Sequence, residues 1–393
     1  MKYFCYLFVA VFILVSGKGE ANPTNDSVVE ELYISEDFTA EGLFTGGIEG
    51  PAVDSKGNLY AVNFQKDGTI GIIDTAGNAR IFCALPAGSI GNGIRFDKLD
   101  NMYIADYTGH NILLIPAGKS EAEVYLHNAS FNQPNDLAIM SNGILFASDP
   151  SWSNSKGKLW SIGTDKVAVL LDGNMGTTNG IEVSQDEKRL YVNETVQQKI
   201  WKFDLNENGE ISNKTLFVSF TDDYGLDGMR CDVDGNLYVT RFGKGTIAIF
   251  SPDGILLHEV PLKGSEPSNI AFGGVDGRTC FVTMADRKMI EMFRTETPGR
   301  EWMLNHGSTD TRSDLGINFR IRIYPNPADT HINLSKLVPD SNITVVDITG
   351  RIMARIKNDS EDAFIDVRNW KKGLYFVSVQ SGRSAVVSKV VIK

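Results

Sequence analysis

One short phrase recurs six times along this chain. In each copy an oxygen-bearing residue opens an apolar stretch, and these first residues are Glu49, Asn92, Asn135, Asn179, Asp227 and Ser268. Successive copies begin 41–48 residues apart, which is the length of one four-stranded blade of a β-propeller. The repeat therefore predicts an all-β fold with a six-bladed β-propeller, in which each of these residues begins the innermost strand of one blade.

The remainder of each repeat fits the same fold. Residues 57–62 and 235–240 each begin with Gly-Asn and continue with aromatic and aliphatic residues, as the strands of β-hairpins do. No helical periodicity competes with this pattern. We expect the propeller to span residues 30–302, with the segment before Glu49 completing the last blade.

The N-terminus and the net charge restrict where the protein works and what it binds. Residues 1–21 carry a positive charge near their start, at Lys2, continue with an apolar run and end in small residues, which is typical of a secretory signal peptide. No later segment is apolar enough to cross a membrane. The net charge of −11, without any Lys or Arg cluster, argues against a nucleic-acid partner.

The C-terminal part differs in pattern from the repeats. Residues 303–316 are polar and patternless and are interpreted as a linker, and residues 317–393 carry short alternating runs that predict a small antiparallel β-sandwich. Four motifs stand out in this tail: Tyr324-Pro325-Asn326-Pro327, Asp347-Ile348-Thr349-Gly350-Arg351, Lys372-Gly373-Leu374-Tyr375 and Lys389-Val390-Val391-Ile392-Lys393. With them the tail resembles the C-terminal sorting domain of type IX secretion. The resemblance implies that the type IX secretion machinery is a partner; the alternative is an accessory binding module.

The first residues of the six copies, which we call the axial ring, offer only oxygen ligands. Hard oxygen ligands suit calcium or magnesium, whereas zinc prefers imidazole or thiolate. A cation held there would keep one face open to substrate, as a Lewis-acid catalyst requires. The alternative is that these residues cap strands and turns, as Asn, Asp and Ser often do. Glu49 is a poor turn former, which favours the metal site.

A second set of polar residues follows the ring by 14 or 15 positions, at Asn63, Asp106, Asp149, Glu194 and Arg241. At that distance the second strand of each blade returns to the same face. We expect Asp149, Glu194 and Arg241 to line the mouth of the pocket and bind substrate. The alternative is that each forms a salt bridge between blades.

Several stretches of the repeats match a known pattern: Glu49-Gly50-Pro51, Gln133-Pro134-Asn135-Asp136, Asp149-Pro150, Thr178-Asn179-Gly180-Ile181, Leu190-Tyr191-Val192, Gly225-Leu226-Asp227-Gly228-Met229 and Ser268-Asn269-Ile270-Ala271-Phe272-Gly273. Through them the propeller resembles the senescence marker protein / gluconolactonase / luciferin-regenerating family. The resemblance implies a divalent cation on the axis, most often calcium, with Glu49, Asn135, Asn179 and Asp227 as its ligands. The sequence does not separate calcium from magnesium or zinc.

The same resemblance implies an activity. The family hydrolyses lactones, some relatives hydrolyse phosphotriesters, and the residue matching Asp227 is often assigned as the base or nucleophile. Asn135 would bind the cation or steer the substrate. Members that cleave gluconolactone place an Arg two residues before Asn135, whereas this chain has Gln133. The resemblance therefore does not predict a sugar lactone as the substrate.

Three functional hypotheses follow. The leading one is an exported metal-dependent lactonase or esterase with a small lactone or ester as substrate, released or held at the cell surface. The second is a non-catalytic ligand-binding β-propeller on the cell surface, because propellers serve both uses. The third, a strictosidine-synthase-like propeller that works without metal, is disfavoured by the ring of oxygen ligands.

Overall fold

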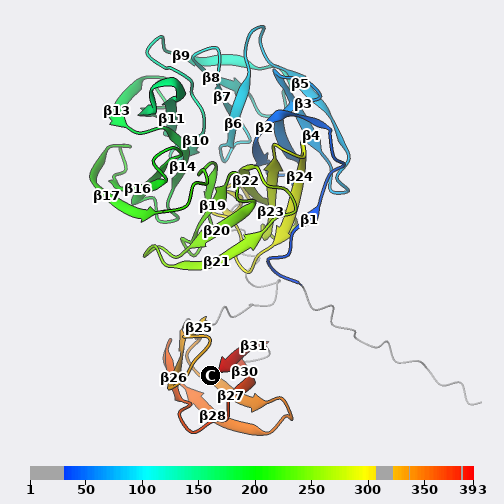
Figure 1. Cartoon of the computed structure of the whole chain (residues 1–393), viewed down its shortest axis with the longest axis vertical. Helices are drawn as coiled ribbons and strands as arrows, with labels where there is room; N and C mark the ends of the chain where they lie inside the picture. The colour runs from blue at the N-terminus through cyan, green and yellow to red at the C-terminus, as the bar shows by residue number, and fades with distance from the viewer. Residues whose placement is uncertain (1–30, 307–321, 336, 382–383) are drawn as a thin grey trace, which may run out of the picture.

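A computed structural model of the protein describes residues 31–306, 322–335, 337–381 and 384–393. Within these residues the chain is almost entirely β-strand, which confirms the predicted all-β class. Six four-stranded sheets formed by residues 36–294 surround a central axis (Figure 1). The predicted signal peptide and residues 307–316 of the predicted linker lie outside the described residues.

We call these sheets blades 1–6, and all of their strand pairs are antiparallel. Blades 1–3 comprise β2 (Phe44–Val53), β3 (Leu59–Phe64), β4 (Thr69–Ile73) and β5 (Ala79–Ala84); β6 (Gly91–Phe96), β7 (Met102–Asp106), β8 (Asn111–Ile115) and β9 (Glu123–His127); and β10 (Leu137–Ile139), β11 (Leu145–Ser151), β12 (Lys156–Ile162) and β13 (Ala168–Met175). A short 3-10 helix, η1 (Trp152–Asn154), joins β11 to β12.

Blades 4–6 repeat the arrangement. They comprise β14 (Thr178–Val183), β15 (Arg189–Glu194), β16 (Lys199–Leu205) and β17 (Ile211–Ser219); β18 (Met229–Cys231), β19 (Leu237–Arg241), β20 (Thr246–Phe250) and β21 (Leu256–Pro261); and β22 (Pro267–Gly273), β23 (Thr279–Met284), β24 (Met289–Arg294) and β1 (Glu36–Asp37). Strand β1 pairs with β24, with Glu36 opposite Met292. The segment before Glu49 therefore completes the last blade, as predicted.

Glycine follows the ring residue in several repeats because the neighbouring blade passes too close for a side chain. A Cβ atom at Gly50, where φ is +56°, would lie 2.1 Å from the backbone oxygen of Asn92. A Cβ atom at Gly180 would lie 2.2 Å from the backbone oxygen of Asp227. Because these glycines have no side chain, the first strand of one blade can pack closely against the next blade, and the ring residues come to lie at the axis.

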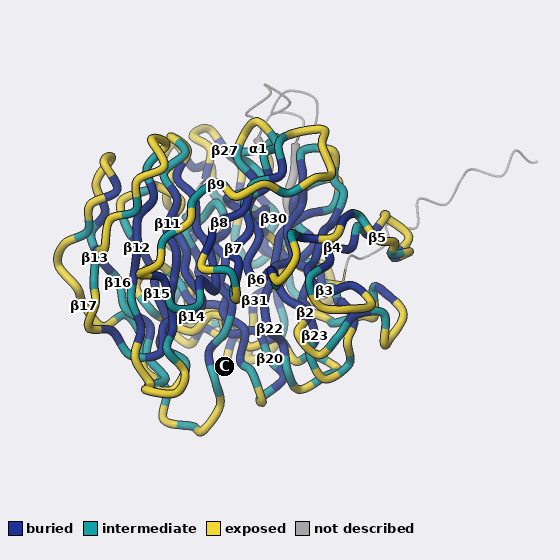
Figure 2. Tube along the Cα trace, turned by 90° about the horizontal axis from the view of Figure 1, so that it is seen from above, coloured by how far each residue is buried: buried dark blue, intermediate teal, exposed yellow. Residues whose placement is uncertain are grey.

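The hydrophobic core of the propeller lies between adjacent blades. One cluster joins side chains of blades 1 and 2, among them Tyr60, Val62, Ile70, Ile94 and Ile104. Figure 2 shows the result along the chain, with buried residues in the interior and exposed residues at the turns and outer strands. Each blade thus depends on its neighbours for burial, which is why the ring must close.

Helix α1 (Arg300–His306) follows the last blade and contacts the inner strands β18 and β22. Its Glu301 carboxylate lies 2.8 Å from Nε of Arg95 and 3.6 Å from Nε of Arg230, two buried arginines of β6 and β18. The helix includes the first residues of the predicted linker 303–316, so that boundary is corrected. Among the described residues, no helix has the length and apolar character that a bilayer crossing needs.

The described residues from 322 onward form a second β-structure with its own core. Its two antiparallel sheets contain β25 (Arg322–Tyr324), β26 (His331–Ser335) and β29 (Ala363–Asp366), and β28 (Ile352–Asn358), β27 (Ser341–Asp347), β30 (Gly373–Ser381) and β31 (Ser384–Ile392). Side chains from both sheets, such as Ile332, Ile343, Ile365 and Val377, share one buried cluster. This is the small antiparallel sandwich that the sequence predicted.

Candidate functional site

A cavity of about 670 Å³ opens at the axis of the propeller. All members of the axial ring line it: Glu49, Asn92, Asn135, Asn179, Asp227 and Ser268. They lie in, or up to two residues before, the first strands of the six blades, so the repeated register brings them together. The structure thus places the four predicted cation ligands around one cavity, while their roles as ligands stay predictions.

The two ring carboxylates carry more negative charge than their surroundings balance. Burial, and then the charge of Asp136, raises the pKa of Glu49 to about 7. Desolvation, and then the charge of Glu49, raises the pKa of Asp227 well above its ordinary value. Both pKa values rise mainly because burial disfavours the charged form, and repulsion from neighbouring carboxylates adds to the shift. A positive charge placed between them would relieve this repulsion.

Two amide oxygens in the same cavity lack a partner. The Oδ1 atoms of Asn135 and Asn179 are buried and accept no hydrogen bond within the described part of the chain. The amide nitrogen of Asn179 donates to the hydroxyl of Thr195 at 3.1 Å, which fixes the orientation of the group. An unsatisfied buried acceptor costs about 1–3 kcal/mol, so both oxygens are available for a ligand.

This donor set fits a hard divalent cation. Carboxylate and amide oxygens are the ligands that calcium and magnesium prefer, and the four predicted ligands supply two of each, from Glu49 and Asp227 and from Asn135 and Asn179. Within the described ranges, no three His, Cys, Asp or Glu side chains form a group that could hold a metal. A cation at the axis would therefore depend on the amide oxygens as much as on the carboxylates.

Asp136 is a third axial carboxylate, which the sequence analysis did not single out. It is buried, and its oxygens lie 3.2 Å from Nη1 of Arg95 and 3.7 Å from Nη1 of Arg230. Most other repeats have glycine directly after the ring residue. An aspartate in place of this glycine was the feature of the sequence that could have pointed to Asp136. The two arginines compensate its charge on the side where α1 packs.

Comparisons with known proteins identify the families that the two parts of the chain resemble. Residues 39–286 match the family described as the SMP-30/Gluconolactonase/LRE-like region. The chain belongs to this family. Residues 322–393 match the secretion system C-terminal sorting domain, in agreement with the resemblance of the tail.

Two relatives and one solved structure show how far the similarity to this family extends. The gluconolactonase of Zymomonas mobilis is 29% identical over 244 residues, which are 55% of this chain and 67% of the relative. The diisopropyl-fluorophosphatase of Loligo vulgaris is 26% identical over 310 residues, 70% of this chain and 95% of the relative. The calcium-binding protein regucalcin of Agrobacterium tumefaciens superposes with a TM-score of 0.59 at 19% identity, covering 67% of this chain and 95% of that one, and shows the shared fold.

In this member of the family, the predicted substrate-binding residues Asp149 and Glu194 lie outside the cavity wall. The buried carboxylate of Asp149 accepts hydrogen bonds from the backbone of Gln133 at 2.6 Å and from the indole of Trp160 at 3.0 Å. The carboxylate of Glu194 accepts one from the backbone of Gly176 at 2.7 Å. These contacts hold the loops beside the cavity, and direct contact with substrate stays a prediction.

Arg241, the third predicted substrate-binding residue, is also absent from the cavity wall. Its guanidinium pairs with Asp222 and lies 3.8 Å from the ring centroid of Phe220. Arg241 therefore forms a salt bridge, but with a residue of the connection between β17 and β18 and not with a strand of another blade. Direct contact of Arg241 with substrate stays a prediction.

Three aromatic side chains that the sequence analysis did not single out line the cavity: Tyr107, Trp152 and Phe242. Tyr107 and Phe242 directly follow Asp106 and Arg241, which belong to the predicted second set. Asn63, another member of that set, itself lines the cavity. The count from the ring therefore reached the cavity wall at Asn63 and ended one residue before it at Asp106 and Arg241.

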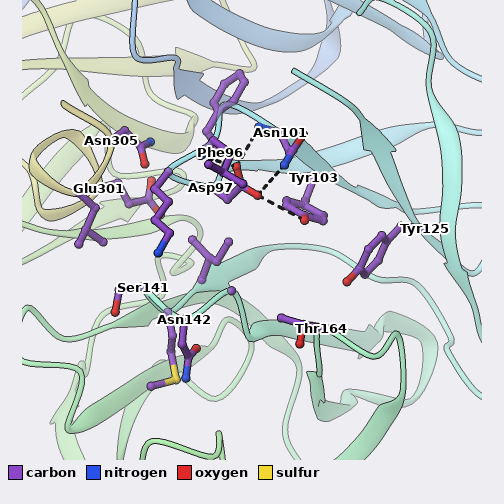
Figure 3. A pocket seen from close by; sticks show the side chains of 16 residues that line it. Phe96, Asp97, Asn101, Tyr103, Tyr125, Ser141, Asn142, Thr164, Glu301 and Asn305 are labelled. Carbon is purple, nitrogen blue, oxygen red and sulfur yellow. Dashed lines mark hydrogen bonds between the residues drawn. The ribbon is translucent and has the colours of Figure 1, made fainter. Parts of the chain in front are cut away.

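A second cavity, of about 380 Å³, lies between turns of blades 2 and 3 and helix α1 (Figure 3). It shares no lining residue with the axial cavity. The carboxylate of Asp97 accepts hydrogen bonds from Asn101 at 2.9 Å and Tyr103 at 3.5 Å, drawn as dashed lines in Figure 3. Glu301 pairs with Arg95. Because these carboxylates already serve the structure, we assign the chemistry to the axial cavity.

Proposed function

We propose that the protein is an exported, divalent-cation-dependent hydrolase that opens small lactones or esters. The observation that carries this proposal is the axial cavity, where the carboxylates of Glu49 and Asp227 meet the unpaired amide oxygens of Asn135 and Asn179. Relatives named gluconolactonase and diisopropyl-fluorophosphatase support a hydrolase. A fold relative described as calcium-binding supports calcium as the ion.

Glu49, Asn135, Asn179 and Asp227 would hold the cation, whose positive charge would polarise the substrate carbonyl and stabilise the oxyanion. Asp227 accepts the proton of the attacking water or attacks the carbonyl carbon itself. Glu49 is oriented by hydrogen bonds from the backbone of Gly50 at 2.8 Å and the amide of Asn269 at 2.9 Å. Asn135 holds the cation or orients the substrate. By either route the net reaction adds one water across the acyl C–O bond of the lactone or ester and yields a carboxylic acid and an alcohol. If Asp227 attacks directly, this water hydrolyses the resulting anhydride and restores the carboxylate.

The location follows from the two ends of the chain. The match of residues 322–393 to a secretion sorting domain supports export through the outer membrane by the type IX machinery. The predicted signal peptide at residues 1–21 supplies the preceding passage through the inner membrane. We therefore propose that the hydrolase acts outside the cell, released or on its surface.

The test is hydrolysis of a panel of lactones and esters by the purified protein, with chelator and with calcium restored. Chelation should abolish turnover, and calcium should restore it. Asp227→Asn should lower kcat by roughly 100-fold or more, because general-base catalysis contributes about that much. Asp253→Asn, at an exposed turn between β20 and β21, is the matched control and should leave kcat unchanged.

Either of two results would overturn the assignment. Full activity of Asp227→Asn would exclude this carboxylate from the reaction. Tight calcium binding without hydrolysis of any lactone or ester would favour the non-catalytic ligand-binding propeller instead. Circular dichroism of each variant establishes that a loss of turnover is not a loss of fold.

A further inference from the structure

Apart from the ring residues, the wall of the axial cavity contains acidic and aromatic side chains. Two acidic residues line it, Asp67 from blade 1 and Glu266 directly before blade 6. The aromatic residues Tyr107, Trp152 and Phe242 line it from blades 2, 3 and 5. Among the described residues, no Lys, Arg or His lines the cavity.

The two wall acids add negative charge that the described protein leaves uncompensated. Asp67 is exposed and accepts a hydrogen bond from the hydroxyl of Thr45 at 2.8 Å, while Glu266 is partly exposed. Neither carboxylate forms a salt bridge with a residue in the described ranges. A divalent cation would balance Glu49 and Asp227, so the charge of the wall acids would remain for the substrate to meet.

The aromatic residues offer apolar surface at the same opening. Trp152 is 37% exposed, and Tyr107 and Phe242 are partly exposed. Exposed aromatic faces bury apolar groups of a ligand and also attract cations. Both wall features therefore favour the same kind of ligand, one without negative charge.

We propose that this cavity selects lactones or esters that are uncharged or cationic and carry an apolar substituent, and that it discriminates against anionic ones. Asp67 and Glu266 set the charge preference, and Trp152 supplies the apolar contact. This inference rests on the proposed function, because it concerns the substrate of the same site. It names residues that neither the ring pattern nor the second polar set includes.

The size of the charge effect follows from Coulomb's law. In water, a unit charge about 10 Å from a charged substrate changes its kcat/KM, relative to that of a neutral substrate, roughly twofold. The change is larger where the space between the charges is partly desolvated. Removal of both acids should therefore raise kcat/KM for an anionic substrate, relative to that for a neutral one, by roughly threefold or more. Added salt screens exposed charges, so the preference should shrink as ionic strength rises.

The experiment compares kcat/KM for an aryl-substituted lactone with that for the same lactone bearing a carboxylate on the aryl group. Wild-type protein should have the higher kcat/KM for the uncharged lactone. In the double variant Asp67→Asn/Glu266→Gln, the ratio of the two kcat/KM values should move toward one. Trp152→Ala should lower kcat/KM for the aryl lactone, relative to its unsubstituted parent, by roughly tenfold. Asp253→Asn serves as the charge control. A wild-type ratio near one, or an unchanged ratio in the double variant, would overturn the inference.

A binding measurement separates this inference from the proposed function. Calorimetry with the matching lactams, which resist hydrolysis, reports recognition without turnover. If the uncharged lactam binds more tightly than the carboxylated one while no lactone is hydrolysed, the inference stands and the proposed function fails. If lactones are hydrolysed but neither assay discriminates by charge, the inference alone fails.

Discussion

Single residues at the axis are positioned by hydrogen bonds to neighbouring blades. The amide of Asn92 donates to the backbone oxygen of Asn135 at 3.0 Å, and the amide of Asn193 donates to that of Asp227 at 2.5 Å. The ring residues are therefore held by tertiary contacts that span two blades. Substitution of Asn92 would therefore also remove a hydrogen bond between neighbouring blades.

Asp149 provides a prediction at this scale. Asp149→Ala would leave the buried indole N–H of Trp160 and two backbone N–H groups, those of Asn132 and Gln133, without their acceptor. An unsatisfied buried donor costs about 1–3 kcal/mol, and the two backbone groups are only partly buried and can bond to water instead, so we expect a loss of roughly 2–4 kcal/mol in the free energy of unfolding. Denaturant unfolding measures this loss, and KM should not change.

The opposite outcome for Asp149→Ala would also be informative. An increased KM at unchanged stability would show that this carboxylate contacts substrate, as the sequence analysis expected, and that its observed hydrogen bonds contribute little. Asp253→Ala, at an exposed turn, is the control for removal of an aspartate.

The register of the repeats predicted the axial ring, and the cavity contains every member of it. The mouth of the cavity could not be predicted in the same way. Trp152 lies in η1, a helix that only blade 3 inserts between its second and third strands. Asp67 and Glu266 lie in connections outside the strands. Loop conformation depends on tertiary contacts, so a repeat pattern does not show which loop side chains point inward.

At the scale of elements, helix α1 attaches to the propeller through charge. Glu301 lies between Arg95 and Arg230, and Arg300 pairs with Glu187 at 2.6 Å. Helix α1 has 7 residues, too few for a helical period to be recognised in the sequence. Its ion pairs join positions far apart in the chain, so no local pattern predicted the helix.

Glu301→Ala should destabilise the propeller. The substitution leaves two buried arginines with Asp136 as their nearest strong acceptor, and breaking a buried pair from one side costs several kcal/mol. Since Glu301 is partly exposed, we expect the free energy of unfolding, measured with denaturant, to fall by roughly 2–4 kcal/mol. Glu207→Ala, at an exposed turn, should change stability by less than about 0.5 kcal/mol. Equal stability of the two variants would show that α1 is not anchored through Glu301.

At the scale of the whole molecule, the propeller and the tail bury separate cores. The tail cluster contains no propeller residue, and the blade clusters contain no tail residue. The period of the repeats and the alternating runs of the tail predicted both parts from sequence, because each pattern is local and regular. The boundary between them was less accurate, since α1 extends the propeller part to residue 306.

Deletion of residues 322–393 should therefore separate location from activity. We expect the truncated protein to keep the kcat and Tm of the propeller but to stay inside the outer membrane. Cell fractionation together with a lactone assay measures both properties. Export of the truncated protein at the wild-type level, or loss of its activity although it is folded, would contradict the division of roles.

The central claim is that Glu49, Asn135, Asn179 and Asp227 share one divalent cation, and calorimetric titration of calcium into chelator-treated protein tests it most directly. The account predicts one site in the wild-type protein. It also predicts at least roughly tenfold weaker binding in Glu49→Gln, which removes the negative charge of one ligand, and in Asn179→Ala, which removes an oxygen ligand. Asp253→Asn should bind as the wild type does. Calcium binding of unchanged strength in both ligand variants, or no binding by the wild type, would contradict the account.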